Sequence, residues 1–278
     1  MQGKTVVITG GTSGIGQVAA EKLAGMGARV ILVARSQSRG EAALSRLREI
    51  APVAKHGIYY GDLSRLAELR RVGQEIAAAE TRIDVLINNA GAMFGQRQLT
   101  DDNLELTFAT NHLSYFVLTN ALSERLITSA PSRVINTSSH AHYRSTIDFD
   151  NMQYEHDYKA FPAYSRSKLC NVLFTRVLAR RLAGTGVTAN SLHPGFVNTR
   201  FGDGTSGAIA RIIGLMKVFA ISPQKGAETI IYLASSDDMA KTTGLYFYKC
   251  KPVKPSKLAQ DDAAAERLWE YTDRLLSH

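Results

Sequence analysis

The segment TVVITGGTSGIG, residues 5–16, runs from a β-branched, apolar stretch through a glycine-rich turn into a helical pattern. Its first five residues predict a buried strand, and apolar residues recur at helical spacing after the turn. The N-terminus of a helix attracts phosphate groups, and glycines let the backbone approach them closely. The spacing Gly10-x-x-x-Gly14-x-Gly16 differs from the more common G-x-G-x-x-G dinucleotide fingerprint. An ordinary tight turn is the alternative, and the position directly after a strand favours a dinucleotide site.

The same alternation of short strands and longer helices continues along the chain. Near-continuous apolar strands such as Val6-Val7-Ile8 suit a parallel sheet that helices cover on both faces. We expect strands at residues 5–9, 29–34, 57–60, 83–88, 133–137, 187–192 and 244–247. We expect helices at residues 15–26, 38–50, 64–79, 101–129, 163–183, 224–235 and 263–276. The sequence therefore predicts an α/β fold, a Rossmann-like, doubly wound and mainly parallel seven-stranded sheet with helices on both faces.

Two segments break this alternation, residues 140–161 and about 196–221, and both follow predicted strands directly. Doubly wound sheets bind their ligands at that end, so these segments are interpreted as substrate loops. No internal repeat, low-complexity tract or linker divides the chain. Residues 1–278 are therefore expected to form a single dinucleotide-binding domain that also carries the reactive residues.

Composition excludes several classes of protein. Of the 278 residues, 45% are hydrophobic, which is enough to fill a core without disulfides or metals. Cys170 and Cys250 lie far apart with no metal-ligand spacing around them, so no disulfide framework and no metal site are expected, and a reducing, cytoplasmic location fits. No apolar run reaches the ~18 residues of a membrane span, and the chain enters its first strand without a signal peptide pattern.

The net charge of +8 would suit an anionic partner, but basic and acidic residues alternate along most of the chain. We therefore expect no nucleic-acid partner. The lysine-rich stretch 249–257 contains no acidic residue and is interpreted as a solvated loop rather than a binding patch. His140, His142 and His193 lack partners at metal-ligand spacing and are interpreted as loop or structural residues.

A cation follows the second predicted strand, in the sequence Val33-Ala34-Arg35-Ser36. NAD-specific sites place an Asp or Glu there to accept hydrogen bonds from the ribose 2′-hydroxyl. Arg35 can instead pair with a 2′-phosphate through charge-assisted, bidentate hydrogen bonds, and Arg39 could assist. NADP, as NADPH, is therefore favoured and NAD is less favoured; two solvated arginines are the alternative.

Tyr164 and Lys168 lie four residues apart near the start of a predicted helix, so both side chains project from one face. A tyrosine ordinarily has a pKa near ~10, and a neighbouring ammonium or an oxidised nicotinamide favours the phenolate and lowers that pKa. The pair can therefore serve as a general acid and base. Taken alone, the pattern Y-x-x-x-K is also common on solvated helices.

In combination, these motifs resemble the short-chain dehydrogenase/reductase family in its short single-domain form, along nearly the whole chain. The resemblance rests on the glycine turn, Asn88-Asn89-Ala90-Gly91, the serine after the fifth strand, Tyr164-x-x-x-Lys168 and His193-Pro194-Gly195, in that order. The stretches Asn111-His112-Leu113, Ser138-Ser139-His140-Ala141-His142 and Leu173-Phe174-Thr175 look like the retinol dehydrogenase branch.

The resemblance implies a role for four catalytic residues. Tyr164 would exchange a proton with the substrate oxygen, while Lys168 would lower the pKa of Tyr164 and hold the nicotinamide ribose. Ser139 would hydrogen-bond the substrate oxygen; its neighbour Ser138 is the competing choice, and the retinol dehydrogenase-like branch uses the second serine. Asn111 would steady a water that connects Lys168 to solvent.

The resemblance also implies a set of cofactor-binding residues. Asp62 would contact the adenine, Asn89 and Gly91 would line the cofactor, and Thr199 would meet the nicotinamide carboxamide. The complete expected set is Gly10, Thr12, Ser13, Gly14, Ile15, Gly16, Arg35, Asp62, Asn89, Ala90, Gly91, Tyr164, Lys168, Pro194, Gly195, Val197 and Thr199.

These residues predict an NADP-dependent oxidoreductase that interconverts a carbonyl and an alcohol on a small, fairly apolar substrate. Aromatic residues between Ser139 and Tyr164 either line an apolar substrate wall or pack locally. A non-catalytic, NADP(H)-sensing regulatory protein on the same fold is the alternative, and the intact Tyr164 and Lys168 argue against it. No hydrophobic anchor precedes Lys4, so a relative without a membrane span is expected, and the resemblance implies a homodimer or homotetramer.

Overall fold

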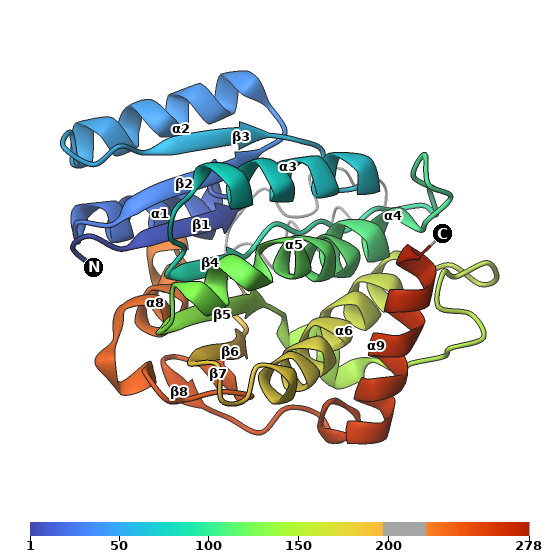
Figure 1. The fold of residues 1–278 in the computed structure, drawn as a ribbon. Helices are drawn as coiled ribbons and strands as arrows, with labels where there is room; N and C mark the ends of the chain where they lie inside the picture. The colour runs from blue at the N-terminus through green and yellow to red at the C-terminus, as the bar shows by residue number, and fades with distance from the viewer. Residues whose placement is uncertain (197–220, 278) are drawn as a thin grey trace.

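The computed structural model describes residues 1–196 and 221–277. One eight-stranded sheet, in the order β3-β2-β1-β4-β5-β6-β7-β8, forms its centre, and helices cover both faces (Figure 1). The strands are β1 Thr5–Thr9, β2 Arg29–Ala34, β3 Gly57–Tyr60, β4 Val85–Asn88, β5 Ser132–Thr137, β6 Val187–Leu192, β7 Tyr246–Tyr248 and β8 Lys251–Pro252. Strands β1 to β7 pair in parallel, and β8 pairs antiparallel with β7. The predicted Rossmann-like α/β fold class is confirmed.

The helices divide between the two faces of the sheet. Their bounds are α1 Gly14–Gly25, α2 Gln37–Ile50, α3 Leu66–Ala79, α4 Leu106–Phe108, α5 Ser114–Thr128, α6 Ala160–Arg181, α8 Pro223–Ser235 and α9 Asp262–Leu276. Helices α1, α2 and α8 pack on one face, and α3, α5 and α6 pack on the other. Helix α9 lies outside α5 and α6, where Trp269 stacks on Phe174 (Figure 1).

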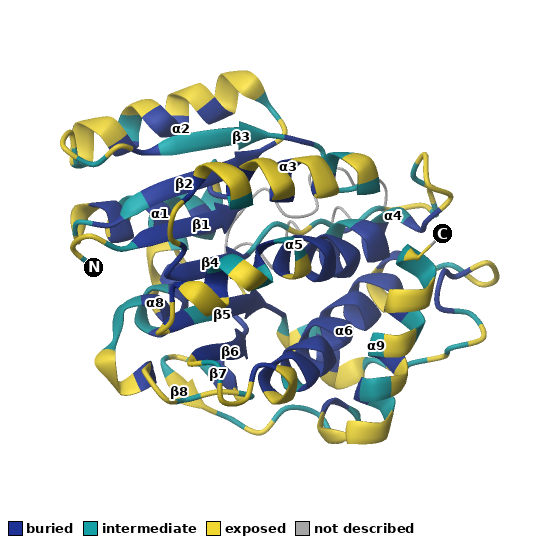
Figure 2. Cartoon of the chain, viewed as in Figure 1, coloured by how far each residue is buried: buried dark blue, intermediate teal, exposed yellow. Residues whose placement is uncertain are grey.

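Alternate residues of a strand point to opposite faces, and this periodicity builds two core layers around β1. Val6 and Ile8 pack with Leu23 of α1, whereas Val7 packs with Val72 of α3 and all are buried. Burying both faces explains why the central strands read as continuous apolar runs. Figure 2 shows these strands buried and the outer faces of α2 and α3 exposed.

The strand order reverses direction at β1, which pairs with β2 on one side and with β4 on the other. In doubly wound sheets, helices leave the two neighbouring strands toward opposite faces at such a point, and ligands bind in the crevice outside the carboxyl ends of the strands. The glycine turn after β1 lies at this crevice. The fold thus brings the segments after β1, β2, β4, β5 and β6 to the same edge of the sheet.

The structure differs from the sequence-based expectation in three places. The helical region predicted at 101–129 begins only at Leu106, because Leu99 and Glu105 form a β-bridge and the Glu105 carboxylate accepts the N–H groups of Thr107 and Phe108. Between α4 and α5, Ala109–Leu113 form a π-helix. The lysine-rich stretch is not only a loop, because Lys251–Pro252 form the short edge strand β8, which makes an eighth strand.

The observed bounds also differ from those of the predicted substrate loops. The loop expected at 140–161 contains a 3₁₀ helix, His140–Arg144, and ends at Lys159, because α6 begins at Ala160. Of the loop expected at 196–221, residues 197–220 lie outside the described residues. Within residues 1–196 and 221–277, no helix has the length and apolar character needed to cross a membrane.

Candidate active site

The glycine turn is built for close backbone approach. Gly10 and Gly14 have positive φ values of 67° and 57°, which favour glycine. A Cβ added to Gly16 would lie 2.3 Å from the carbonyl oxygen of Gly10 and 2.5 Å from Nδ2 of Asn89. Gly16 therefore lets the first turn of α1 pack directly against the end of β1.

The segment after β4 braces this turn. Oγ1 of Thr9 accepts hydrogen bonds from the backbone N–H groups of Asn89 and Ala90, at 2.9 and 3.0 Å. Nδ2 of Asn89 donates to the carbonyl oxygens of Thr9, at 3.2 Å, and Gly10, at 3.4 Å. Thr9 links two strand ends and was missed from the sequence, although its polar side chain at the end of an apolar strand could have indicated it.

The start of α1 provides the remaining turn residues. Thr12 and Ile15 are half-buried, while Ser13 is exposed and occupies the N-cap position in extended conformation. The Ser13 side chain makes no cap hydrogen bond to the helix. The first N–H groups of α1 therefore have no side-chain acceptor from the cap and can bind an anionic group.

Tyr164 and Lys168 lie on the inner face of α6. Tyr164 is 9% exposed and packs with Met93 and Ala160. Nζ of Lys168 lies 5.8 Å from the centre of the Tyr164 ring and donates to the carbonyl oxygen of Thr137 at 3.1 Å. Since an ammonium has three N–H donors, Lys168 can hold further oxygen atoms beside that of Thr137.

The two serines after β5 have different hydrogen-bond partners. Ser138 is buried, and its Oγ donates to the carbonyl oxygen of Lys168 at 2.6 Å, so it joins β5 to α6. Ser139 is partly exposed; its Oγ accepts the N–H of Ala141 at 3.2 Å, and its hydroxyl hydrogen-bonds Tyr164. Ser139, rather than Ser138, therefore shares the site with the Tyr164 hydroxyl.

Asn111 lies in the π-helix and contacts the segment after β4. Its Oδ1 accepts the N–H of Ala92 at 2.8 Å, and its Nδ2 donates to the Ala92 carbonyl oxygen at 2.8 Å and to Oγ of Ser167 at 2.9 Å. A Cβ on Gly91 would lie 3.2 Å from Oδ1 of Asn111 and 3.0 Å from Nζ of Lys168. Gly91 therefore separates these two side chains without filling the space between them. π-helical turns recur at functional sites.

Tyr115, one helical turn beyond Asn111, was also missed. Its hydroxyl donates to the carbonyl oxygen of Ala90 at 2.8 Å and lies 3.4 Å from that of Thr137. It thus ties the ends of β4 and β5 together beneath the site. The i, i+4 spacing from Asn111 places it on the same helix face and could have identified it.

Burial dominates the electrostatics of Tyr164 and Lys168. It raises the pKa of Tyr164 to about 12, and the hydrogen bond with Ser139 opposes this rise. It lowers the pKa of Lys168 from 10.5 to about 7. A buried site disfavours either charge alone, so a phenolate here requires a cation beside it. The resemblance implies that Lys168 lowers the pKa of Tyr164. In the chain by itself, burial raises that pKa instead.

The opposite end of the crevice is solvated. Arg35, directly after β2, is 67% exposed at its side chain, and its Nη1 lies 3.9 Å from Oδ2 of Asp62, which is 33% exposed. Oδ1 of Asp62 accepts hydrogen bonds from the backbone N–H and the hydroxyl of Ser64. Arg39 is exposed in the first turn of α2. The ion pair between Arg35 and Asp62 was not foreseen, because the two residues follow different strands.

The segment after β6 completes the described part of the site. Pro194 and Gly195 lie there, half-buried, and Gly195 has a φ of 92°. Its N–H donates to Nδ1 of His193 at 3.2 Å. Val197 and Thr199, also expected to contact the cofactor, lie outside the described residues.

These positions fit a dinucleotide. The turn at Gly10 and Gly16 has no Cβ that could fill the space, and the N-terminus of α1 opens onto it. The carboxyl ends of the strands lead from Arg35, past this turn, to Lys168. An extended cofactor with a central diphosphate would meet the exposed guanidinium of Arg35 at one end and the buried side chain of Lys168 at the other.

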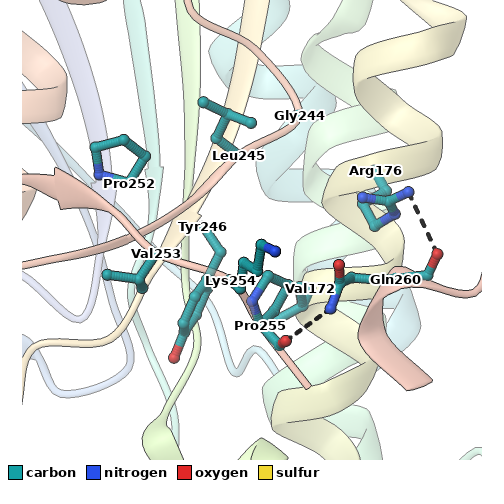
Figure 3. A pocket seen from close by; sticks show the side chains of 10 residues that line it. All are labelled: Val172, Arg176, Gly244, Leu245, Tyr246, Pro252, Val253, Lys254, Pro255 and Gln260. Atoms are coloured by element: carbon teal, nitrogen blue, oxygen red, sulfur yellow. Dashed lines mark hydrogen bonds between the residues drawn. The ribbon is translucent and has the colours of Figure 1, made fainter. Parts of the chain in front are cut away.

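A separate hollow lies outside this site. It has a volume of about 290 Å³ and is bordered by Tyr246, Val253, Lys254 and Arg176, beside α6 and the β7–β8 edge (Figure 3). Asn111, Ser139, Tyr164 and Lys168 are not among the residues that line it. In the part of the chain that the structure describes, no cluster of three or more His, Cys, Asp or Glu could hold a metal ion.

Comparisons with known proteins identify the family of this chain. A family model described as short chain dehydrogenase matches residues 4–207. Human retinol dehydrogenase 14 is 41% identical over 98% of this chain and 86% of its own length, and human retinol dehydrogenase 13 is 40% identical over 99% and 85%. The crystal structure of an uncharacterized protein from Mycobacterium Paratuberculosis has a TM-score of 0.80 at 34% identity, covering 99% of this chain and 94% of its own. The motif resemblance is thereby confirmed: the chain belongs to the short-chain dehydrogenase/reductase family of NAD(P)-binding oxidoreductases, in its retinol dehydrogenase-like branch.

Proposed function

We propose that this protein is an NADP-dependent oxidoreductase that interconverts a carbonyl and an alcohol on a small, fairly apolar substrate, with Tyr164 as general acid and base. One observation carries the proposal: the hydroxyls of Ser139 and Tyr164 meet beside the buried ammonium of Lys168. Two hydroxyl donors that converge on one point can bind a single substrate oxygen. A proton source and a cation then lie within reach of the same atom.

When bound, the nicotinamide cofactor supplies or accepts the hydride. During reduction, negative charge grows on the substrate oxygen, and hydrogen bonds from Ser139 and Tyr164 stabilise that charge. Tyr164 then delivers the proton. Burial keeps Tyr164 protonated in the chain alone, since its pKa is about 12, so the acid form is the resting form.

Lys168 and Asn111 support the proton transfer in this proposal. The ammonium of Lys168 compensates a phenolate on Tyr164 and has N–H donors for the ribose hydroxyls. The side chain of Asn111 is committed to Ala92 and Ser167, which holds the π-helix against the segment after β4. We propose that Asn111 there steadies a water that connects Lys168 to solvent.

The preference for NADP rests on Arg35. Its guanidinium is exposed after β2, where a 2′-phosphate would lie next to the adenine ribose, and Arg39 stands nearby. Asp62 beside Arg35 is proposed to contact the adenine, and its carboxylate reduces the local positive charge. The remaining expected contacts, Val197 and Thr199 included, belong to the same proposal.

An apolar substrate is proposed from the surroundings of Tyr164. Met93, Ala160 and Tyr158 pack with the Tyr164 ring, and Phe161 is exposed one residue into α6. Two other aromatic residues of this stretch have partners away from Tyr164: Phe149 packs near Tyr271 of α9, and Tyr154 lies under Arg166. The relatives are named retinol dehydrogenases, and retinol is an apolar alcohol.

Three broader expectations remain part of the proposal. Residues 1–278 are taken as a single dinucleotide-binding and catalytic domain with substrate loops near 140–159 and 196–221. A cytoplasmic location is supported by Cys170 and Cys250, which are both free thiols. A homodimer or homotetramer is proposed from family membership.

A panel assay tests the function. The purified protein is incubated with NADPH or NADH and with aldehydes and ketones of graded hydrophobicity, retinaldehyde and a reactive dicarbonyl included, while cofactor oxidation is followed by absorbance. We expect consumption of NADPH, faster than that of NADH, and a rate that rises with the apolar area of the carbonyl compound. Binding of NADPH without its oxidation by any compound would instead support the NADP(H)-sensing alternative.

A further inference from the structure

We propose that His142 is a positioning residue, whose neutral ring holds Ser139 against the C-terminal segment and so aims the Ser139 hydroxyl at the substrate oxygen. This inference rests on the proposed function, because it assigns His142 a role through Ser139. His142 lies in the 3₁₀ helix directly after Ser139, and its side chain is completely buried.

Both ring nitrogens of His142 have partners from the backbone. The N–H of Ser256, between β8 and α9, donates to Nε2 at 3.1 Å. Nδ1 lies 2.8 Å from the carbonyl oxygen of Ser139. The ring therefore bridges the loop after β5 and a segment more than a hundred residues later in the chain.

This geometry selects one form of the ring. Because an N–H of Ser256 points at Nε2, that nitrogen carries the lone pair, and the single ring hydrogen resides on Nδ1. Nδ1–H then donates to the Ser139 carbonyl oxygen. The charged form would place a second N–H opposite the N–H of Ser256 and break the bridge, so the bridge requires neutral His142.

The surroundings of His142 favour the neutral ring. Tyr143 packs against it from the same 3₁₀ helix, and Tyr246 of β7 packs edge-on with its hydroxyl 3.4 Å from Nδ1. His193 stacks near Tyr246, and His140 lies next to Tyr143. No carboxylate belongs to this described set of neighbours, and burial lowers the pKa of His142 to about 4.

The bridge acts on the orientation of Ser139. The Ser139 carbonyl also accepts the N–H of His142 at 3.2 Å, and the Ser139 Oγ accepts that of Ala141. With its carbonyl and one Oγ lone pair engaged, Ser139 has a single O–H hydrogen left, which it donates to Tyr164 in the chain alone and to the substrate oxygen when substrate is bound. Loss of the His142 ring would leave the Ser139 carbonyl with the backbone N–H of His142 alone and would remove the tether to Ser256, which lets the serine turn.

Kinetics of four variants test the role: Ser139→Ala, His142→Phe, the double variant and His142→Gln. We expect Ser139→Ala to lower kcat about 100-fold, as loss of an oxyanion donor does. We expect His142→Phe to lower kcat about 10-fold while KM and the NADPH Kd stay within about twofold. In the Ser139→Ala background the same change should have no further effect on kcat, because its target is already gone.

His142→Gln is the rescue variant, since an amide keeps one donor and one acceptor; kcat within about threefold of the wild type supports the bridge. His140→Phe is the matched control, an exposed histidine in the same 3₁₀ helix, and should stay within about twofold. If His142→Phe fails to fold, the Gln variant and the double variant of Gln with Ser139→Ala carry the test.

The outcomes separate this inference from the proposed function. If Ser139→Ala leaves kcat unchanged, the proposed role of Ser139 is wrong. If Ser139→Ala is impaired but His142→Phe is not, or if the two losses multiply in the double variant, Ser139 stands and the positioning role of His142 is overturned. Losses that do not multiply, with rescue by Gln, support both.

Discussion

The two ends of the crevice are built in opposite ways. At one end, which we propose to be the catalytic end, Lys168 and Asn111 are buried and hydrogen-bonded to backbone atoms that follow β5 and β4. At the other end, which we propose to hold the adenine, the Arg35 side chain is 67% exposed, and its ion-pair partner Asp62 is 3.9 Å away and 33% exposed. Packing holds the first group in one geometry, whereas water and salt compete for the second.

This difference predicts where substitutions act. When a buried polar group loses its hydrogen-bond partner, it stays out of water with no bond to replace the one it lost. Changes at the catalytic end should therefore have large effects on turnover. An exposed charge loses only a screened interaction, so changes at the adenine end should shift affinity and cofactor choice by small factors. The glycine turn, which follows β1, lies between these two ends of the site.

Tyr164→Phe should have the largest effect. It removes the proposed proton donor and keeps the ring that packs against Met93 and Ala160. Turnover should fall by about 1,000-fold, within the range for loss of a general acid, while the NADPH Kd changes little. Steady-state NADPH oxidation and fluorescence titration of NADPH measure the two quantities. Turnover equal to that of the wild type would remove Tyr164 from the mechanism and leave the catalytic end without a proton source.

Gly16→Ala should have the next largest effect. The new Cβ would lie 2.3 Å from the Gly10 carbonyl oxygen, a backbone atom that cannot yield cheaply. The free energy of unfolding should fall by about 3 kcal/mol, the upper end for overpacking, and NADPH binding should weaken as the turn shifts. Urea unfolding and NADPH titration measure both.

The control for Gly16→Ala lies in the same helix. At Gly25, the last residue of α1, an added Cβ would meet Ile50 at an ordinary 3.6 Å. Gly25→Ala should leave stability unchanged or raise it slightly, because alanine favours the helix. If both variants lose the same free energy of unfolding, the loss comes from replacing glycine in the helix and not from the close approach at the turn.

The glycine turn also shows what sequence could predict. The bounds of β1, β2, β3 and β6 matched the expected ranges, because apolar, β-branched runs bounded by turn residues depend on local patterns. The Tyr164–Lys168 pair was equally local, since i, i+4 spacing on a helix brings two side chains to one face. These features need no knowledge of the neighbouring elements.

Features that depend on contacts between distant segments were not predicted. In the π-helix, Asn111 makes hydrogen bonds to Ala92 and Ser167, which lie in other segments, and the late start of α4 follows from the Glu105 cap. The pairing of Arg35 with Asp62 required the neighbouring positions of β2 and β3. A single sequence carries no periodic signal for such contacts.

Lowering the pH should reduce the free energy of unfolding through the buried His193. Burial lowers the pKa of His193 from 6.5 to about 4. Between these values the unfolded chain takes up a proton that the folded chain does not, so the free energy of unfolding falls as the pH falls. From pH 7 to pH 5, this residue should account for about 2 kcal/mol. Urea unfolding at both pH values measures the loss, and His193→Gln should reduce it by that amount. Equal losses in both proteins would mean that His193 titrates alike in the folded and unfolded chains.

Arg35→Ala should have the smallest effect, and it probes the solvated end most directly. Loss of one exposed, charge-assisted pair should weaken NADPH binding about tenfold at low salt and leave NADH within about twofold. Titrations at low and high salt, with Arg48→Ala of α2 as an exposed arginine control, separate phosphate recognition from net charge. The difference between Arg35→Ala and wild type should shrink as salt increases, whereas turnover at saturating NADPH should stay constant. A large loss of turnover would instead mean that the adenine end positions the reacting ring, and the contrast between the two ends would fail. An unchanged NADPH preference would mean that another cation binds the 2′-phosphate, and Arg39 would be the next residue to replace.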